Sequence, residues 1–177
     1  LIFLKNLNSQ IIKIPSHEIY NLDLISECLK NFDKVLISTG AAKWEEIKAI
    51  LNLENKNKMV LMHCVSSYPL KSEQVNFPRM IELKKHVQEV GYSGHCDGIE
   101  DAIAAFTLGA VIVEKHFTID KTLPGRDNKF AILPDQLKEI SNFRDKFNDM
   151  NKNHGLDLQE CEKDVFNNYR GRWSNNK

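Results

Sequence analysis

KVLISTGAAKWEEIKAILNLENKNKMVLMHC (residues 34–64) contains two short apolar runs separated by an amphipathic stretch. The runs KVLIS (34–38) and MVLMH (59–63) are almost wholly apolar, as strands are when both faces of their sheet are covered. Between them, WEEIKAIL (44–51) carries apolar residues at helical spacing. A strand, a helix and a second strand in this order predict a βαβ unit with parallel strands.

The same alternation continues on both sides of this segment. Further strands are predicted at 10–14, in the second half of 86–93 and at 110–115, and further helices at 21–32, 78–85, 98–109 and 134–150, the last with Pro134 in its first turn. We therefore expect one α/β domain over residues 1–150 and a polar, irregular tail over 151–177.

Five parallel strands fit either a small doubly wound sheet or part of a (β/α)8 barrel. A complete barrel usually needs about 250 residues, and this chain has 177. Length alone therefore favours the open sheet. The residues that follow the strands favour the barrel, because they are chemically functional at every strand end.

Composition narrows the possible functions. Lys plus Arg and Asp plus Glu number 24 each, which argues against binding to nucleic acid or a membrane surface by bulk charge. No apolar stretch approaches the roughly 20 residues of a membrane span, and the N-terminus lacks the basic region of a signal peptide. The four cysteines form no C-x-x-C pair, so we expect no zinc ribbon or disulfide framework, and a cytoplasmic location.

Polar side chains of functional types follow all five predicted strands. The segments are KIPSHE (13–18), STG (38–40), HCVSSYP (63–69), GYSGH (91–95) and EKH (114–116). Active sites of parallel α/β folds form at these carboxyl ends. Any one strand becomes polar where it leaves the core, but hydroxyls, imidazoles, carboxylates and an ammonium at all five ends favour a site.

Two kinds of site are suggested by these segments. His95 and His116 end consecutive strands, roughly 5 Å apart, and could share a metal ion that Glu114 ligates or orients; a core histidine is the alternative for each. Two imidazoles alone would suit zinc or iron. The second kind of site would bind an anion through an ammonium, hydroxyls and backbone N–H groups, although serine and glycine at these turns are also ordinary helix caps. Its residues would be Lys13, Ser16, Ser38, Thr39 with Gly40, and Ser93.

GYSGHCDGIE (91–100) and LGAVIVEKHFTIDKTLPGRD (108–127) resemble the sialic acid synthase family, which includes N-acetylneuraminate, legionaminate and pseudaminate synthases. The resemblance covers about residues 1–140. It implies a (β/α)8 barrel that joins phosphoenolpyruvate to a 2-acetamido sugar such as N-acetylmannosamine and releases phosphate, using Mn²⁺ or Mg²⁺. KIPSHE would then belong to the fourth strand. We therefore expect this chain to contain the last five β/α units and to be marginal or inactive alone. We expect the complete protein to be a homodimer.

The resemblance also implies a role for individual residues. By position, His95 and His116 are the metal ligands, and Glu18 and Glu114 are the acidic catalytic residues, with Glu18 placed to position or deprotonate a water. Phosphoenolpyruvate would be bound by Lys13, Ser16, Ser38 and Ser93, and the sugar by Ser66, Tyr68 and Asp127. The sequence departs from the family at Ser66, Gly94, Cys96 and Arg126, which would affect the choice of sugar.

Three other readings compete with this one. Another phosphoenolpyruvate-using barrel synthase, or an aldolase with Lys13 as its Schiff-base lysine, would use the same fold. A sugar-binding or assembly module without catalysis would retain the site residues and the metal. A nucleotide-binding sheet is disfavoured, because no G-x-G-x-x-G follows the first strand and no P-loop is present.

Overall fold

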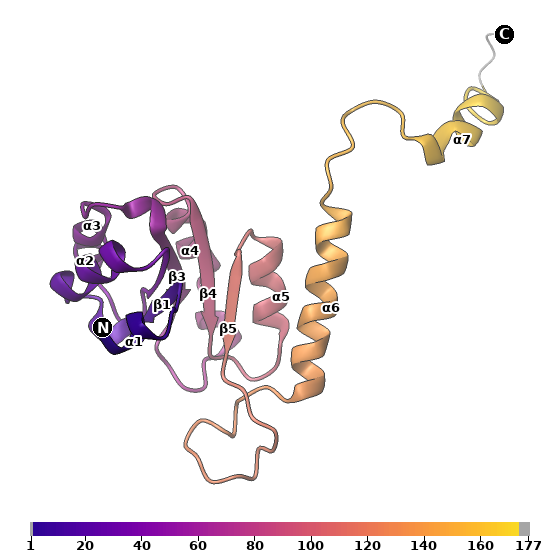
Figure 1. Cartoon of the computed structure of the whole chain (residues 1–177). Helices are drawn as coiled ribbons and strands as arrows, with labels where there is room; N and C mark the ends of the chain where they lie inside the picture. The colour runs from indigo at the N-terminus through magenta and orange to yellow at the C-terminus, as the bar shows by residue number, and fades with distance from the viewer. Residues whose placement is uncertain (1, 174–177) are drawn as a thin grey trace. The chain divides into compact units, whose positions relative to one another are not determined.

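The computed structural model describes residues 2–173 and divides into two compact units, residues 1–144 and 145–177. In the first unit five strands form one parallel sheet in the order β1-β2-β3-β4-β5 (Figure 1). The strands are β1 (Ile11–Ile14), β2 (Lys34–Ser38), β3 (Met59–Cys64), β4 (Glu89–Gly94) and β5 (Ile112–Lys115). Each strand pairs with the next one in sequence, without the reversal of order that defines a doubly wound sheet.

Helices connect the strands, as the alternating pattern predicts. They are α1 (Ile2–Asn6), α2 (Leu22–Asn31), α3 (Trp44–Leu51), α4 (Phe77–Leu83), α5 (Glu100–Thr107) and α6 (Pro134–Met150), with short 3-10 turns at η1 (Ser16–Glu18), η2 (Lys56–Lys58) and η3 (Ser72–Gln74). The predicted start of the last helix at Pro134 is confirmed. Asn21 caps α2, since its side chain accepts a hydrogen bond from the backbone N–H of Leu24.

All four connecting helices cover the same face of the sheet. One buried cluster contains the strand residues Val35 and Ile37 and at least one residue from each connecting helix. The helix residues include Ile25 of α2, Ile47 of α3, Met80 of α4 and Ala105 of α5. Side chains alternate along a strand, so the other residues of each strand point to the opposite face. Helices on one face and strands in sequential order make this sheet a half-barrel, and the barrel prediction is confirmed.

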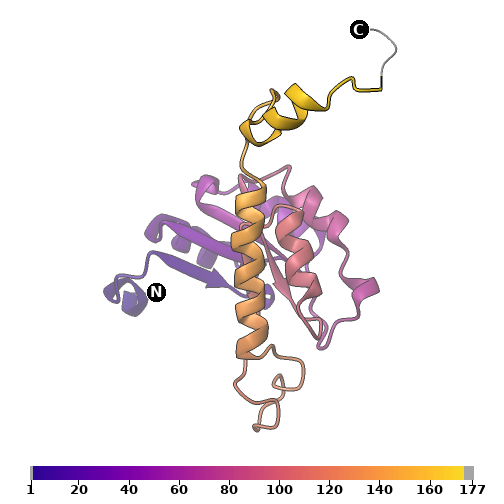
Figure 2. The same cartoon turned by 90° about the vertical axis from the view of Figure 1, so that its right-hand side faces the viewer.

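The half-barrel ends beside α6. A second small cluster joins Ile140 of α6 to Ala102 of α5 and to Ile132, which lies in the segment after β5. Figures 1 and 2 both show α6 running beside α5. Val113 of β5 packs against this cluster, so α6 meets the helix-covered side of the last strand.

The second unit contains more regular structure than the sequence suggested. A 3-10 turn, η4 (Glu160–Glu162), leads into a short helix, α7 (Lys163–Asn168). The expectation of an irregular tail is therefore wrong for residues 160–168. Among residues 2–173 no helix is both long and apolar enough to cross a bilayer.

His63 is a buried polar residue on the helix-covered face of β3. Its side chain is fully buried, with Nε2 2.7 Å from the carbonyl oxygen of Val75. Nδ1 has no hydrogen-bond partner within the described chain. Burial lowers the pKa of His63 below its usual value of 6.5, the Val75 carbonyl opposes that shift, and Arg79 adds to it.

The buried His63 should make stability depend on pH. Below about pH 6.5 the unfolded chain binds a proton that folded His63 does not, so its stabilising contribution is present above that pH and is lost as the pH falls. In urea titrations between about pH 7 and pH 5, His63→Leu should reduce the loss of unfolding free energy by up to about 1 kcal/mol per pH unit. An unchanged slope would contradict this prediction.

Candidate functional site

Glu114 connects the two edges of the sheet on its open face. Its Oε1 lies 2.6 Å from Nζ of Lys13 and accepts a hydrogen bond of 2.9 Å from Oγ of Ser93. These residues come from β5, β1 and β4 respectively. Both side chains of the ion pair are about one-third exposed, at 32% for Lys13 and 39% for Glu114. The ion pair therefore presents an ammonium and a carboxylate to the solvent-accessible open face, with the buried hydroxyl of Ser93 beside them.

Hydroxyl groups gather beside this pair. The Oγ atoms of Ser16 and Ser66 are 3.1 Å apart, although the two residues are 50 positions apart in sequence. Ser38 is buried, and its Oγ has no hydrogen-bond partner within residues 2–173. A buried hydroxyl without a partner is costly, and a ligand oxygen would satisfy it. Ser38 thus supports the predicted anion site on geometric grounds.

Sequence reasoning missed the thiol within this group. Sγ of Cys64 lies 3.9 Å from Oγ of Ser66, and burial raises the pKa of Cys64, so the group is a neutral thiol at neutral pH. The sequence offers one indication of this position, because Cys64 belongs to HCVSSYP (63–69), the same strand-end segment that supplies Ser66 and Tyr68. Its side chain faces the open surface, in register with Ser93 and Glu114.

The two histidines lie side by side, as their strand positions predict. The ring centroids of His95 and His116 are 5.3 Å apart in an edge-to-face arrangement. Nδ1 of His95 is 2.9 Å from the carbonyl oxygen of Val65, and Nδ1 of His116 is 3.4 Å from Oδ2 of Asp127. Oxygen partners at Nδ1 leave Nε2 of each ring as the potential ligand atom, which is how metal-binding histidines are commonly oriented.

The protonation state of His95 suits a ligand. Burial lowers its pKa, the Val65 carbonyl opposes this shift, and the nearby His116 adds to it. A neutral imidazole has the free lone pair that metal binding requires.

Aromatic rings surround the histidine pair. Tyr68 lies with its ring centroid 4.3 Å from His95 and 5.9 Å from His116, and Phe130 lies 5.1 Å from His116. Burial raises the pKa of Tyr68, so its hydroxyl is protonated at neutral pH and available as a hydrogen-bond donor. Tyr68 and Asp127 therefore meet at the histidines, where the predicted sugar site would lie.

The two imidazoles could supply two ligands to a divalent ion and would leave its other coordination positions open. No cluster of three or more His, Cys, Asp or Glu side chains able to hold a metal occurs among residues 2–173. Two imidazoles alone would leave several positions to substrate oxygens and water, as in catalytic rather than structural sites.

Glu18 hydrogen-bonds a residue outside these groups. It is half-buried in η1, and its Oε2 accepts a hydrogen bond of 3.1 Å from Asn21. In the described chain its hydrogen bond goes to the start of α2 rather than to Glu114 or the histidines. Side-chain contacts join Lys13, Glu114 and Ser93, join Ser16 and Ser66, and join His95, His116, Tyr68 and Asp127, whereas Ser38 and Glu18 have no hydrogen bond to any of these groups within residues 2–173.

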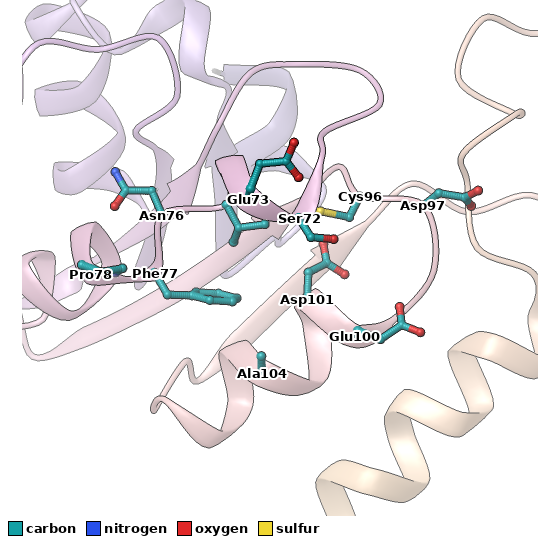
Figure 3. Close-up of a pocket in the computed structure, with 11 residues that line it drawn as sticks. Ser72, Glu73, Asn76, Phe77, Pro78, Cys96, Asp97, Glu100, Asp101 and Ala104 are labelled. Atoms are coloured by element: carbon teal, nitrogen blue, oxygen red, sulfur yellow. The ribbon is translucent and has the colours of Figure 1, made fainter.

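A separate cavity of about 620 Å3 lies on the helix-covered side of the sheet, between the starts of α4 and α5 (Figure 3). Phe77 and Pro78 line it from α4, and Glu100 and Asp101 line it from α5. None of the predicted site residues is in its lining.

Comparisons with known proteins agree on one family. The model of the NeuB family matches residues 1–154. N,N'-diacetyllegionaminic acid synthase of Campylobacter jejuni is 41% identical over 143 residues, which are 77% of this chain and 43% of that protein. Human N-acetylneuraminate-9-phosphate synthase is 33% identical over 143 residues, covering 78% of this chain and 40% of that protein. The chain thus spans less than half the length of these relatives.

Solved structures show the same fold. An N-acetylneuraminic acid synthetase from Leptospira borgpetersenii, in complex with citrate, superposes with a TM-score of 0.85 at 30% identity, over 99% of this chain and 62% of that one. A truncated 3-deoxy-D-arabino-heptulosonate 7-phosphate synthase from Thermotoga maritima gives a TM-score of 0.61 at 18% identity, over 80% of this chain and 59% of that one, and supports the fold alone.

A glycine at position 40 should be required for the side chains of Ser16, Ser66 and Cys64 to pack together. A Cβ at this position would overlap Oγ of Ser66 and would lie 2.8 Å from Sγ of Cys64. Gly40→Ala should therefore lower the free energy of unfolding by about 1–3 kcal/mol, measured by urea titration. The control Ser67→Ala, at an exposed position nearby, should change it by less than about 0.5 kcal/mol. Equal stabilities of the two variants would contradict the close packing at Gly40.

Proposed function

The chain belongs to the NeuB family, and from this premise we propose that the complete protein condenses phosphoenolpyruvate with a 2-acetamido sugar, such as N-acetylmannosamine, into a nonulosonic acid. The observation that carries the proposal is the Lys13–Glu114–Ser93 set on the same open face and strand end as the His95–His116 pair. Anion donors and two convergent imidazoles are the groups that the two substrates need. In the complete protein, further strands would pair with the two edge strands β1 and β5 and close the barrel.

Lys13, Ser93 and Ser38 are the proposed binding groups for phosphoenolpyruvate, together with Ser16. The substrate carries up to three negative charges, and an ammonium with several hydroxyl donors offsets them through charge-assisted hydrogen bonds. Glu114 accepts from both Lys13 and Ser93, so it fixes the direction of these donors before substrate binds. The unpartnered Oγ of Ser38 is ready to donate to a substrate oxygen.

His95 and His116 would hold the divalent ion, for which the family implies Mn²⁺ or Mg²⁺. When bound, that ion supplies a Lewis acid for the aldehyde oxygen of the open-chain sugar. Tyr68, Asp127 and Ser66 would orient the sugar, since Tyr68 packs on His95 and Asp127 contacts His116. Sugar and phosphoenolpyruvate thus come to neighbouring places on one concave face, which favours reaction between them.

The proposed reaction forms one carbon–carbon bond and one carbon–oxygen bond, the latter to water, and breaks the carbon–oxygen bond to phosphate. The enol carbon of phosphoenolpyruvate attacks the aldehyde carbon, and the aldehyde oxygen becomes a hydroxyl. Water adds at C2 of the resulting cation and gives up a proton to a carboxylate, for which Glu18 and Glu114 are the candidates. Phosphate then leaves from C2 with the electron pair of its C–O bond, while the new C2 hydroxyl loses its proton and becomes the keto group. Of the two protons of the added water, one ends on the former aldehyde oxygen and the other on the released phosphate or in solvent.

Lys13 and Lys34 offer a matched pair of variants. Each lysine forms a 2.6 Å ion pair on the open face, Lys13 with Glu114 near the carboxyl ends of the strands and Lys34 with Glu89 near their amino ends. In the complete protein, Lys13→Met should raise KM for phosphoenolpyruvate on the order of tenfold or more, because a charge-assisted hydrogen bond is lost. Lys34→Met should leave that KM unchanged. A selective rise in the KM for the sugar in Lys13→Met would mean that the two substrate sites are reversed.

His116 should be required for metal-dependent condensation. His116→Ala in the complete protein should abolish formation of the nonulosonic acid across a Mn²⁺ titration, while the fold persists because the ring is only partly buried. His86, whose ring contacts Trp44 away from the strand ends, provides the control, and His86→Ala should retain activity. Unchanged activity of His116→Ala would exclude the metal assignment.

A further inference from the structure

Lys115 lies between two site residues but points the other way. Glu114 and His116 face the open surface, whereas Lys115 enters the helix-covered side and meets Asp101 of α5. Its Nζ is 3.0 Å from each carboxylate oxygen of Asp101. The two side chains are only 4% and 3% exposed. A lysine and an aspartate are rarely this buried unless they are paired.

The ion pair belongs to a larger network. The hydroxyl of Tyr92, on β4, donates to Oδ2 of Asp101 at 3.0 Å. Nζ of Lys115 also donates to the backbone carbonyl oxygen of Cys96 at 2.7 Å. Gly94 makes room for this arrangement, since a Cβ there would lie 2.5 Å from Oδ2 of Asp101.

The network is attached to the backbone next to both imidazoles. Lys115 directly precedes His116, and Cys96, whose carbonyl it holds, directly follows His95. One ammonium therefore links the end of β5 to the turn after β4. Movement of that turn would change the distance between the rings, which is now 5.3 Å between centroids.

The Lys115–Asp101 ion pair is not expected to add much to the stability of the fold. Desolvation of two charges offsets most of their attraction, and apolar replacements of buried ion pairs are often neutral or stabilising. The hydrogen bond to Cys96 is different, because an apolar side chain could not hold that carbonyl. The charged pair therefore supplies a hydrogen bond to the turn that follows His95, which an apolar pair could not make.

We propose that Lys115 and Asp101 are positioning residues that set the spacing of His95 and His116 from the helix-covered side of the sheet. Asp101 holds the ammonium in place, and the ammonium holds the carbonyl of Cys96. The inference rests on the proposed function insofar as the spacing serves a shared divalent ion.

Two variants in the complete protein separate positioning from stability. Asp101→Asn keeps an oxygen acceptor for Lys115 and its bond to Cys96, but leaves the buried ammonium without a countercharge. Its thermal midpoint should fall while its Mn²⁺ affinity, measured by electron paramagnetic resonance of free Mn²⁺, stays near that of the unaltered protein. The double variant Asp101→Leu/Lys115→Met removes both charges but leaves the Tyr92 hydroxyl and the Cys96 carbonyl without these partners. Its midpoint should fall by no more than that of Asp101→Asn, because no charge stays buried and unpaired. Its Mn²⁺ affinity should nevertheless fall on the order of tenfold.

Lys58→Met is the matched control. Nζ of Lys58 also donates to backbone carbonyls, those of Leu29 and Phe32, each at 3.0 Å, but none of these residues adjoins a histidine of the pair. Its loss should leave Mn²⁺ affinity unchanged. Affinity that follows the thermal midpoint in all three variants, or an unaltered affinity in the folded double variant, would overturn the proposal.

A metal-free measurement distinguishes this inference from the proposed function. Nuclear Overhauser contacts between the ring protons of His95 and His116 should be present in the unaltered protein and in Asp101→Asn, and lost in the double variant. If the unaltered protein binds no Mn²⁺, the metal assignment fails, and these ring contacts alone decide whether Lys115 and Asp101 position the pair. Ring contacts that persist in the double variant would refute it.

Discussion

The ion pair between Lys13 and Glu114 requires the sheet to curve. The two residues lie on the first and last of five strands, so four strand spacings of about 4.8 Å would put them about 19 Å apart in a flat sheet. The register adds to this separation, because Lys13 lies level with Val60 of β3 whereas Glu114 lies level with Cys64. Only strong curvature and stagger, as in a barrel wall, allow a 2.6 Å contact between them. The short contact shows that the open face is concave, and the hydroxyls and imidazoles lie on it.

Strand alternation divides the chemistry of β5 between two faces. Glu114 and His116 point to the concave face, and Lys115 between them points to the helices. The exposed pair of Glu114 with Lys13 is accessible to a substrate, while the buried pair of Lys115 with Asp101 is not. Three consecutive ionisable residues thus have separate environments, and the same strand supplies donors for ligands on one side and internal support on the other.

Much of the fold and part of the site could be predicted from particular residues. WEEIKAIL predicts α3 with the observed bounds, and the end of KVLIS coincides with the end of β2, because the apolar periods are unbroken there. His95 and His116 are neighbours because consecutive parallel strands place their carboxyl ends together. Asp101 could not be assigned as the partner of Lys115, since they are 14 residues apart and on different elements. The residue type of Cys64 gives no signal of a site, because a lone cysteine at the end of a strand is usually a core residue.

What the sequence determined by itself is local: five apolar strand runs, the helices between them, and the residues that stand at each strand end. Family membership also follows from the sequence, because the model of the NeuB family matches residues 1–154. Only the tertiary structure decided that the sheet curves, that Lys13 meets Glu114 across it, and that Glu18 hydrogen-bonds Asn21 instead of joining them. The physical reason is that periodicity specifies which face of a strand a side chain takes. Curvature and register, which bring distant strands together, arise only when all the helices pack against the sheet at once.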